Sequence, residues 1–429
     1  LILALPAAPG DEDHMRNVRI LPLAEENSTL TASAPLIARM ANFSTLRVME
    51  LTRVNGDGWD PTSEDAPAFD DAQWSDIVRG VPVRALCRLA KDCGNKRLWI
   101  NVSHNAAGTG DAAVATYAQA FIAELEDELP QDYEVIIESP GNESCFNTIF
   151  QSCQDFQTRG GVLFNTGDAA RDGARYAARK AIQWAQACQA AETGKLRITY
   201  VLGAFVADNQ VNDELRTYEL GGVKCEDVYG GYAVAPYILT DFGQTNEGNY
   251  GLQIIDDLET GLSFAVDAMF VEANTRIAGF ASDTAATVTA WASTGMDVYF
   301  YEGPSPHIFL SLSPINLTTN TDFHEACQAF VDDPRMFALT QAIVNAVLPL
   351  CTGVACYYTL AGQTQDPVTV GVFGALMFAS SSVTDPDSPI FRALVDLATA
   401  STGGVSGGNF SGKVATNKVA ASKLRKGKV

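Results

Sequence analysis

The sequence predicts an α/β fold, specifically a (β/α)8 barrel, and three observations favour it. Short apolar, β-branched segments alternate along the chain with longer segments of helical periodicity, which is typical of βα units around a parallel sheet. Eight such short segments can be counted, the number that suits a closed barrel. With 429 residues the chain is long enough for one large barrel, although it would also accommodate two ordinary domains.

The predicted strands are rich in Val, Ile, Leu and aromatic residues and are separated by segments long enough to hold helices. Their ranges are residues 18–23, 46–51, 98–102, 134–139, 197–202, 232–236, 297–301 and 355–360.

The predicted helices lie between these strands. The segment 111–128 begins with Asp111 as a candidate N-cap, places its apolar residues on one face and stops before Pro130. Segments 169–190, 263–278 and 334–347 have the same character. Long loops at 56–75 and 240–257 follow strand ends, where barrels build their sites, although ordinary surface insertions explain them equally well.

The composition divides the chain into three parts. Residues 1–13 read as a strand left from an upstream β domain, with the tail of a signal peptide as the alternative. Residues 14–400 form the predicted barrel. Residues 401–429 are rich in Gly, Ser and Lys and lack apolar periodicity, which indicates a linker or tail.

The chain is strongly acidic, with a formal net charge of −22. Residues 403–429 hold six basic and no acidic residues, so the rest of the chain carries −28. A body this acidic repels nucleic-acid phosphate, and we therefore expect no nucleic-acid partner. No apolar run reaches the length of a membrane-spanning helix, so we also expect no membrane span.

Nine cysteines are many for a cytosolic enzyme, and six of them lie in three close pairs. The pairs lack the paired C-x-x-C spacing of a zinc site, so disulfides in an oxidising compartment are the better explanation. We predict the bridges Cys87–Cys93, Cys145–Cys153 and Cys351–Cys356. One more bridge could form among the remaining three cysteines.

Sequons for N-linked glycans fit the same compartment. They occur at Asn27, Asn42, Asn101, Asn142, Asn316 and Asn409. We expect glycans at Asn27, Asn42 and Asn316, which fall in predicted loops or element ends. Together with the cysteines, the sequons predict a protein that is secreted or displayed on the cell surface.

Two glutamates follow predicted strands at positions that suit catalysis. Glu143 lies just beyond the fourth strand, and Glu302 closes the seventh. Glycosidic bond cleavage needs one carboxylic acid to protonate the leaving oxygen and a second carboxylate on the other side of the bond. The carboxyl ends of barrel strands meet at one face, so we expect the two carboxyl groups about 5–5.5 Å apart, the separation of retaining enzymes.

An Asn-Glu pair after strand four and a lone Glu after strand seven resemble the signature of clan A glycoside hydrolases. This resemblance implies that Glu143 is the acid/base, Glu302 the nucleophile and Asn142 a hydrogen-bond partner of a substrate hydroxyl. It also implies a TIM barrel, a carbohydrate substrate and no metal or organic cofactor. We expect Asn142 to carry no glycan, because a glycan beside Glu143 would occupy the place of the substrate.

Further short motifs resemble those of poorly characterised, bacterial-type secreted barrels related to that clan, over most of residues 14–400. They are Arg16-Asn17-Val18-Arg19, Leu46-Arg47-Val48-Met49-Glu50, Arg53-Val54-Asn55, the stretch from Trp99 to Ala106, Ala233-Val234-Ala235-Pro236-Tyr237 and Tyr301-Glu302-Gly303. Because each motif is short, they indicate the fold better than the substrate.

Two residues beyond the glutamates are candidates for binding or orienting groups. His104, at the end of the third predicted strand, either bonds a sugar hydroxyl or is a satisfied structural group. Tyr237 follows the sixth strand, and the resemblance to the clan implies that it orients Glu302. Its alternative role is to cap the barrel.

The remaining candidates line the predicted pocket. Glu50, Arg53 and Asn55 follow the second strand, and a strand-end ion pair explains the first two equally well without catalysis. Phe146 is a candidate stacking surface, because the loop after Glu143 lacks the Trp that members of the clan tend to carry there. Tyr357 and Tyr358 are the aromatic residues in the eighth strand.

Two functions from different classes follow from these residues. The first is a retaining glycoside hydrolase that acts on an extracellular polysaccharide or glycan, and retention of both glutamates favours it. The second is a catalytically silent, glycosidase-like structural or carbohydrate-binding module of a larger extracellular assembly with other subunits, favoured by the altered aromatics and surplus cysteines. A nucleotide-binding function is excluded, because no glycine-rich segment joins a strand to a helix.

Overall fold

The computed structural model describes residues 2–4, 41, 43–51, 83, 87, 90–91, 93–102, 111–140, 166–203, 209–241, 262–301, 305–309, 332–357 and 389–402. The predicted first strand at 18–23, the loop at 56–75 and residues 403–429 lie outside these ranges.

One eight-stranded sheet forms the centre of the described structure, in the order β10-β1-β2-β3-β4-β5-β6-β8. Its strands are β10 (Cys356–Tyr357), β1 (Ile2–Ala4), β2 (Thr45–Leu51), β3 (Arg97–Val102), β4 (Glu134–Glu138), β5 (Arg197–Gly203), β6 (Gly231–Val234) and β8 (Asp297–Phe300). All neighbours from β2 to β8 are parallel. The α/β class and the parallel arrangement are therefore confirmed for six strands.

The two end strands of this sheet approach each other. An isolated parallel bridge joins Phe300 in β8 to Ala355, the residue that precedes β10. Two backbone hydrogen bonds strengthen the contact, from Phe300 N to Val354 O at 3.0 Å and from Gly353 N to Val298 O at 2.8 Å.

The N-terminal strand belongs to this sheet. Residues 2–4 form a strand, as the apolar sequence predicts, and β1 pairs antiparallel with both β10 and β2. Leu3 lies opposite Tyr357 on one side and Leu46 on the other. The assignment of this strand to an upstream β domain stays a prediction.

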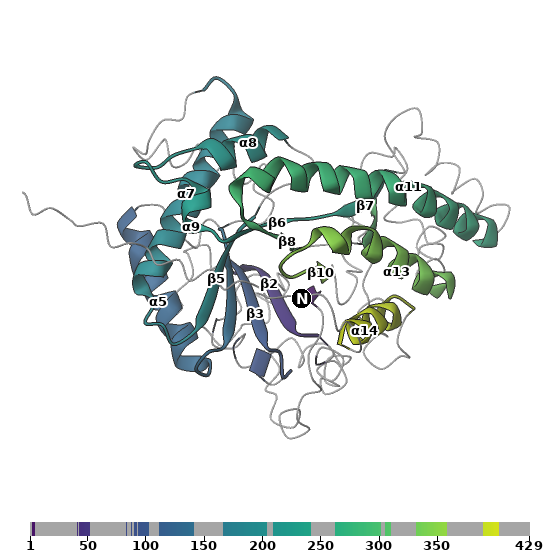
Figure 1. Cartoon of the computed structure of the whole chain (residues 1–429), viewed down its shortest axis with the longest axis horizontal. Helices are drawn as coiled ribbons and strands as arrows, with labels where there is room; N and C mark the ends of the chain where they lie inside the picture. The colour runs from purple at the N-terminus through teal and green to yellow at the C-terminus, as the bar shows by residue number, and fades with distance from the viewer. Residues whose placement is uncertain are drawn as a thin grey trace, which may run out of the picture.

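Helices surround the strands (Figure 1). They are α5 (Asp111–Glu128), α7 (Ala169–Ala191), α8 (Asn209–Thr217), α9 (Cys225–Val228), α11 (Leu262–Trp291), α13 (Arg335–Val347) and α14 (Pro389–Thr402), with short 3-10 turns at Ala292–Thr294 and Leu348–Leu350. α5 has the predicted bounds. α14 extends to Thr402, slightly beyond the predicted end of the barrel domain.

Alternate side chains of each strand enter two different apolar clusters. In β3, Leu98, Ile100 and Val102 pack against the helices, while Trp99 points into the interior that the sheet encloses. In β4, Val135 and Ile137 follow the first pattern and Ile136 the second. Burial on both faces explains why these strands read as almost continuous apolar runs in the sequence.

The long helix α11 continues well past its predicted end at residue 278. The sequence from Gly279 is rich in Thr, a residue that lowers helix propensity. Its hydroxyls donate to carbonyls one turn back, Thr284 to Phe280 O at 2.8 Å and Thr289 to Ala285 O at 2.7 Å. Buried Trp291 then anchors the end by stacking on Tyr232, with ring centroids 4.8 Å apart.

A second, two-stranded sheet was not predicted. β7 (Tyr237–Asp241) pairs in parallel with β9 (Ser305–Phe309). β7 follows β6 closely in the sequence, and β9 follows β8. The two segments of the chain therefore continue side by side beyond the carboxyl ends of β6 and β8. The start of the predicted loop at 240–257 is therefore extended backbone.

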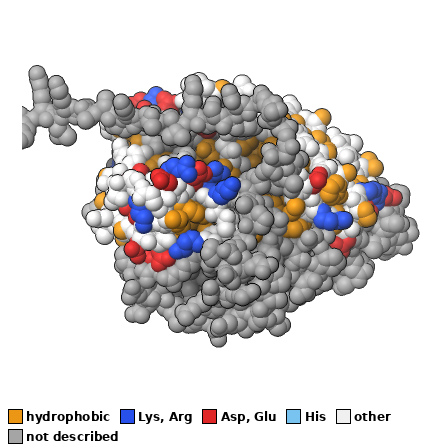
Figure 2. All heavy atoms as spheres, turned by 60° about the horizontal axis from the view of Figure 1, so that its bottom comes forward, with side chains coloured by type: hydrophobic (Ala, Val, Ile, Leu, Met, Phe, Trp, Pro, Cys, Tyr) orange, Lys and Arg blue, Asp and Glu red, His pale blue; other side chains and the backbone are white. Residues whose placement is uncertain are grey.

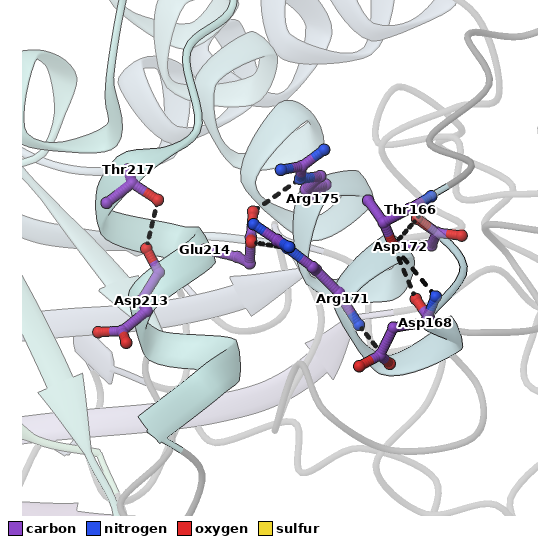
Figure 3. A network of polar contacts seen from close by, with 8 residues as sticks. All are labelled: Thr166, Asp168, Arg171, Asp172, Arg175, Asp213, Glu214 and Thr217. Carbon is purple, nitrogen blue, oxygen red and sulfur yellow. Dashed lines mark hydrogen bonds and ion pairs between the residues drawn. The ribbon is translucent and has the colours of Figure 1, made fainter.

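A cluster of charged side chains joins α7 to α8 (Figure 3). Arg171 and Arg175, one turn apart on α7, both bind the carboxylate of Glu214 on α8, and the Arg175 contact measures 2.7 Å. Glu214 is 8% exposed, so its charge relies on these guanidinium groups. At the start of the same helix, Asp172 accepts hydrogen bonds from Thr166 N at 2.9 Å and from Thr166 Oγ1 at 2.6 Å, which fixes the chain entering α7.

We expect Glu214→Ala to lower the free energy of unfolding by about 1–2 kcal/mol, because it leaves two arginines without their shared partner. Urea denaturation monitored by circular dichroism measures the change. Glu219→Ala is the matched control, since its exposed carboxylate only approaches Lys224 at 3.7 Å. Equal stability of the two variants would contradict the role of this cluster.

The described structure contains neither of the two predicted disulfides whose cysteines it includes. The structure does not join Cys87 to Cys93, and both thiols are buried in the apolar cluster beneath the helices. It does not join Cys351 to Cys356 either, because the two side chains lie on opposite faces of the strand layer. Cys356 points into the sheet interior, whereas Cys351 packs on the helical side and donates to Val298 O at 3.3 Å. Cys145 and Cys153 lie outside the described residues.

The reactivity of the thiols tests whether the Cys87–Cys93 and Cys351–Cys356 disulfides are absent. Burial raises the pKa of the Cys351 thiol to about 12 and that of the Cys225 thiol to about 12. Thiolate is the reactive form, so alkylation by iodoacetamide at pH 8 should be slow in the native protein. In urea without reductant, Cys87, Cys93, Cys351 and Cys356 should all be alkylated. Peptide mapping that finds either pair protected would instead support the predicted disulfide.

Candidate functional site

Most residues predicted to carry chemistry lie outside the described part of the chain. These are Glu143, Glu302, Asn142, His104, Arg53, Asn55 and Phe146, and the same holds for the sequons Asn27, Asn42 and Asn316. Glu50 lies in β2 and Tyr237 in β7, where only the backbone is described. The structure therefore defines the strands that lead to the two glutamates and the interior between those strands.

The strands that precede the two glutamates belong to one parallel sheet. β4 ends at Glu138, five residues before Glu143, and the described chain after β8 ends at Tyr301, directly before Glu302. β5 and β6 lie between β4 and β8 and run parallel to both. The carboxyl ends of the two strands that precede these glutamates in the sequence therefore lie at the same edge of the sheet.

A buried ion pair lies in the interior next to this edge. Arg47 from β2 donates to Oε2 of Glu138 at the end of β4, from Nη2 at 2.8 Å and from Nε at 3.1 Å. The two side chains are 0% and 1% exposed. Trp99 from β3 donates its indole N–H to the same oxygen at 2.8 Å. Such a pair is stable only when several hydrogen bonds compensate for the loss of water, as they do here.

The guanidinium of Arg47 also contacts two aromatic rings. It lies 5.3 Å from the ring centroid of Trp99 and 4.9 Å from that of Tyr301. The face of an aromatic ring attracts a cation, and more strongly when water is excluded. One guanidinium therefore connects β2, β3 and β4 with the residue that immediately precedes Glu302.

The chain leaving β4 is fixed by hydrogen bonds to its neighbours. Ser139 N donates to Val201 O at 2.9 Å, and Ser139 Oγ accepts from Gly203 N at 2.8 Å. Asn101 donates its side-chain amide to Ser139 O at 2.9 Å. A Cβ added at Gly203 would lie 3.2 Å from Oε1 of Glu138, so a larger residue would crowd the buried carboxylate.

Asn101 illustrates why a sequon alone predicts little. The residue satisfies the N-x-S/T pattern, but its side chain is 0% exposed and bonded to the backbone of β4. An oligosaccharide at this amide would require the loss of that hydrogen bond and the opening of the interior. Asn101 in the folded protein is therefore a structural residue.

The second sheet brings Tyr237 near the segment that follows Glu302. In the β7–β9 register Tyr237 lies opposite Ser305, three residues after Glu302. The predicted proximity of Tyr237 to the strand-seven glutamate is therefore consistent with the backbone pairing, and its hydrogen-bonding role stays a prediction.

The described residues carry few features of other site types. Among them, no group of three or more His, Cys, Asp and Glu side chains is arranged to hold a metal ion. None of the described helices combines the length and hydrophobicity needed to cross a bilayer.

The sequence prediction missed the residues that fill the interior: Arg47, Trp99, Glu138 and Tyr301. The signal was present in the period-two alternation of the strands, in which Arg47 interrupts an apolar run and Glu138 closes one. Trp99 pairs with Arg47 in the strand register, as a residue on the same face must. A charged residue and a Trp on the same face of a strand indicate that this face lines a polar interior. The apolar residues of the strand alone do not indicate this.

Comparison with known proteins finds only distant structural similarity. No protein-family model and no curated protein sequence matches the chain. Similar solved structures include a broad-specificity endoglucanase (GH5-4) from an uncultured bacterium, with a TM-score of 0.43 and 14% identity over 86% of this chain and 84% of that one. Native xylanase 10B from Thermotoga maritima has a TM-score of 0.40 and 11% identity over 93% of this chain and 95% of that one.

Fungal β-1,4-galactanases are similar at a comparable level, with a TM-score of 0.41 and 12% identity over 84% of this chain and 90% of the other. At such scores and identities the similarity assigns no activity to this chain.

Proposed function

We propose that the sheet closes into a (β/α)8 barrel over residues 14–400 and that the chain is a retaining glycoside hydrolase acting on an extracellular polysaccharide or glycan. Glu302 attacks the anomeric carbon while Glu143 protonates the leaving oxygen, which gives a covalent glycosyl-enzyme. Glu143 then removes a proton from water, which releases the sugar with its original anomeric configuration.

One observation carries this proposal. In the sequence the two predicted glutamates follow parallel strands of one sheet, and Arg47 in the interior contacts residues at the ends of both strands. Glu138 precedes Glu143 by five residues and binds that guanidinium, and Tyr301 precedes Glu302 and lies against it. A retaining pair must keep its two carboxyl groups about 5–5.5 Å apart, and this contact restrains both chain segments that lead to them.

The interior beneath the proposed site excludes water and holds its charges in a pair, which suits a reaction that uses two carboxyl groups. The described charges there are paired, since Arg47 balances Glu138, and the rest of the cluster consists of Trp99, Tyr299 and Tyr301 with smaller apolar side chains. Exclusion of water strengthens the field that one catalytic carboxylate exerts on the other. Under this proposal Glu143, as the acid, has a higher pKa than Glu302.

The remaining predicted residues are assigned to the substrate. Asn142, His104, Glu50, Arg53 and Asn55 contact sugar hydroxyls. Phe146 provides a stacking surface, and Tyr237 orients Glu302. No cofactor takes part in this reaction, and secretion or surface display is part of the proposal.

A survey of hydrolysis tests the proposal. Purified full-length chain is assayed against aryl glycosides, glycosyl fluorides and polysaccharides, with Glu302→Ala as the negative control and Glu219→Ala as a surface control. The proposal requires hydrolysis of at least one substrate by the parent and by Glu219→Ala but not by Glu302→Ala. Inactivity across the panel would favour the catalytically silent module instead.

A further inference from the structure

A cavity lies at the amino ends of the parallel strands, at the edge of the sheet opposite the one where the strands preceding the proposed catalytic glutamates end. It opens to solvent between the starts of β3, β4 and β5 and has a volume of about 540 Å³. Sites for small molecules usually measure about 300–1,000 Å³. Its walls include Lys96, Arg97, Pro130, Tyr133 and Arg197.

The charges in this cavity oppose those of the protein as a whole. Three cations, Lys96, Arg97 and Arg197, face two carboxylates, Asp132 and Glu134, although the chain carries −22. On the face that Figure 2 shows, Lys and Arg side chains are likewise gathered in groups beside acidic and apolar ones. A cavity with one excess positive charge favours a ligand with one negative charge.

In one of the two guanidiniums of the cavity, that of Arg97, every nitrogen already has a partner within the protein. Arg97 contacts Glu134 Oε2 from Nε at 2.8 Å and from Nη2 at 2.5 Å, and its Nη1 reaches Thr45 Oγ1 at 3.4 Å. It therefore holds Glu134 in place at the start of β4 and has little capacity left for a ligand.

The other two cations retain donors. Arg197 donates from Nε to Asp132 O at 2.8 Å, and its Nη1 lies 3.3 Å from Glu134 Oε1. Its Nη2 makes no hydrogen bond within the described part of the chain. The side-chain ammonium of Lys96 is exposed and forms neither a hydrogen bond nor an ion pair there, although the backbone N–H of Lys96 donates to Ser44 O at 2.9 Å. Both groups line the same cavity, and both are donors suited to a carboxylate.

The apolar part of the wall is rigid and uncharged. The hydroxyl of Tyr133 donates to Asn95 O at 2.6 Å, which fixes the ring. Burial raises the pKa of Tyr133, so the phenol adds no negative charge at neutral pH. Pro130 lies on the same wall and has no rotatable side chain.

We propose that this cavity binds a small monocarboxylate, whose anionic group is held by Arg197 and Lys96 and whose apolar part packs on Pro130 and Tyr133. The planar carboxylate matches the edge of a guanidinium, and its single charge matches the excess charge of the cavity. The site is independent of the proposed glycosidase activity.

Isothermal titration calorimetry of the full chain tests the proposal, with benzoate as the probe and benzamide as its neutral match. At constant ionic strength we expect saturable binding of benzoate and none of benzamide. Arg197→Gln and Lys96→Gln should each weaken benzoate binding at least about tenfold, the effect expected for one charge-assisted hydrogen bond. Lys224→Gln, a cation of the surface between α8 and α9, should bind as the parent does.

Several results would overturn the proposal. Benzoate binding that does not saturate, equal binding of benzamide, or unchanged affinity in both Arg197→Gln and Lys96→Gln excludes the site. Tighter binding of inorganic phosphate than of benzoate excludes its assignment to a carboxylate. Both substituted side chains are exposed or half-exposed, and thermal melts will show whether the variants remain folded.

Discussion

Arg47→Met is expected to lower the free energy of unfolding by about 3–5 kcal/mol, because it leaves the carboxylate of Glu138 charged, buried and without its cation. The hydrogen bond from Trp99 remains but does not supply a positive charge. The loss is a large part of the total stability of an ordinary domain, which is about 5–15 kcal/mol. Urea denaturation measures it.

The double variant Arg47→Met/Glu138→Gln provides the decisive comparison. With the carboxylate neutralised, the desolvated charge is gone, and we expect the double variant to be more stable than Arg47→Met alone. Arg335→Met is the matched control, since that guanidinium is exposed and pairs with Asp267 and Asp333 at the surface. A double variant less stable than Arg47→Met would mean that the buried charge of Glu138 is not the source of the loss.

The second large effect concerns activity. We expect Glu302→Ala to lower kcat by at least about 10⁴-fold, because no other group would form the covalent intermediate. Glu143→Gln should lower it by about 10²–10⁴-fold, the usual contribution of a general acid. The two variants should differ with the leaving group. A glycosyl fluoride needs little protonation, so Glu143→Gln should retain more activity on it than on a polysaccharide, whereas Glu302→Ala should lose both.

Steady-state rates on a fluoride and on a polymer, with Glu219→Ala as the surface control, measure this difference. If Glu143→Gln lowered kcat equally on both substrates, Glu143 would not be the general acid. Undiminished hydrolysis by Glu302→Ala would remove that of the nucleophile.

The elements most completely predicted from sequence are those with strong local patterns. α5 has its predicted bounds because an acidic cap, an apolar face and a following proline define both ends. β3 and β5 differ from their predicted ranges by one residue at an end, since both are rich in large apolar residues and are flanked by polar segments. In contrast, α11 was predicted too short because its second half is rich in Thr, which has a low helix propensity, and is stabilised by tertiary packing such as that of buried Trp291.

Tertiary context determined what the sequence did not reveal. The pairing of β7 with β9 joins segments more than sixty residues apart, and neither has an alternating apolar pattern. β1 lies antiparallel between β10 and β2, which a strand of three residues cannot specify on its own. Sequence spacing likewise suggested a bridge between Cys351 and Cys356, but the strand layer separates the two thiols.

The candidate site was predicted only in part. Glu143 and Glu302 were identified from their positions after apolar strands and from a family resemblance, and the structure shows that the preceding strands are parallel members of one sheet. The interior ion pair of Arg47 and Glu138 was not predicted, because the strands were interpreted by their apolar residues alone.

Trapping of the glycosyl-enzyme tests the central claim most directly. The full chain is incubated with 2-deoxy-2-fluoro glycosyl fluorides of the sugars that it hydrolyses. The 2-fluoro group slows both formation and hydrolysis of the covalent intermediate, and the good fluoride leaving group keeps its formation faster, so the intermediate accumulates. Peptide mass spectrometry then locates the adduct. The account predicts one sugar per chain, attached to Glu302, and no label in Glu302→Ala. A sugar attached to a different carboxylate, or the absence of any adduct in a chain that hydrolyses the parent substrates, would contradict it.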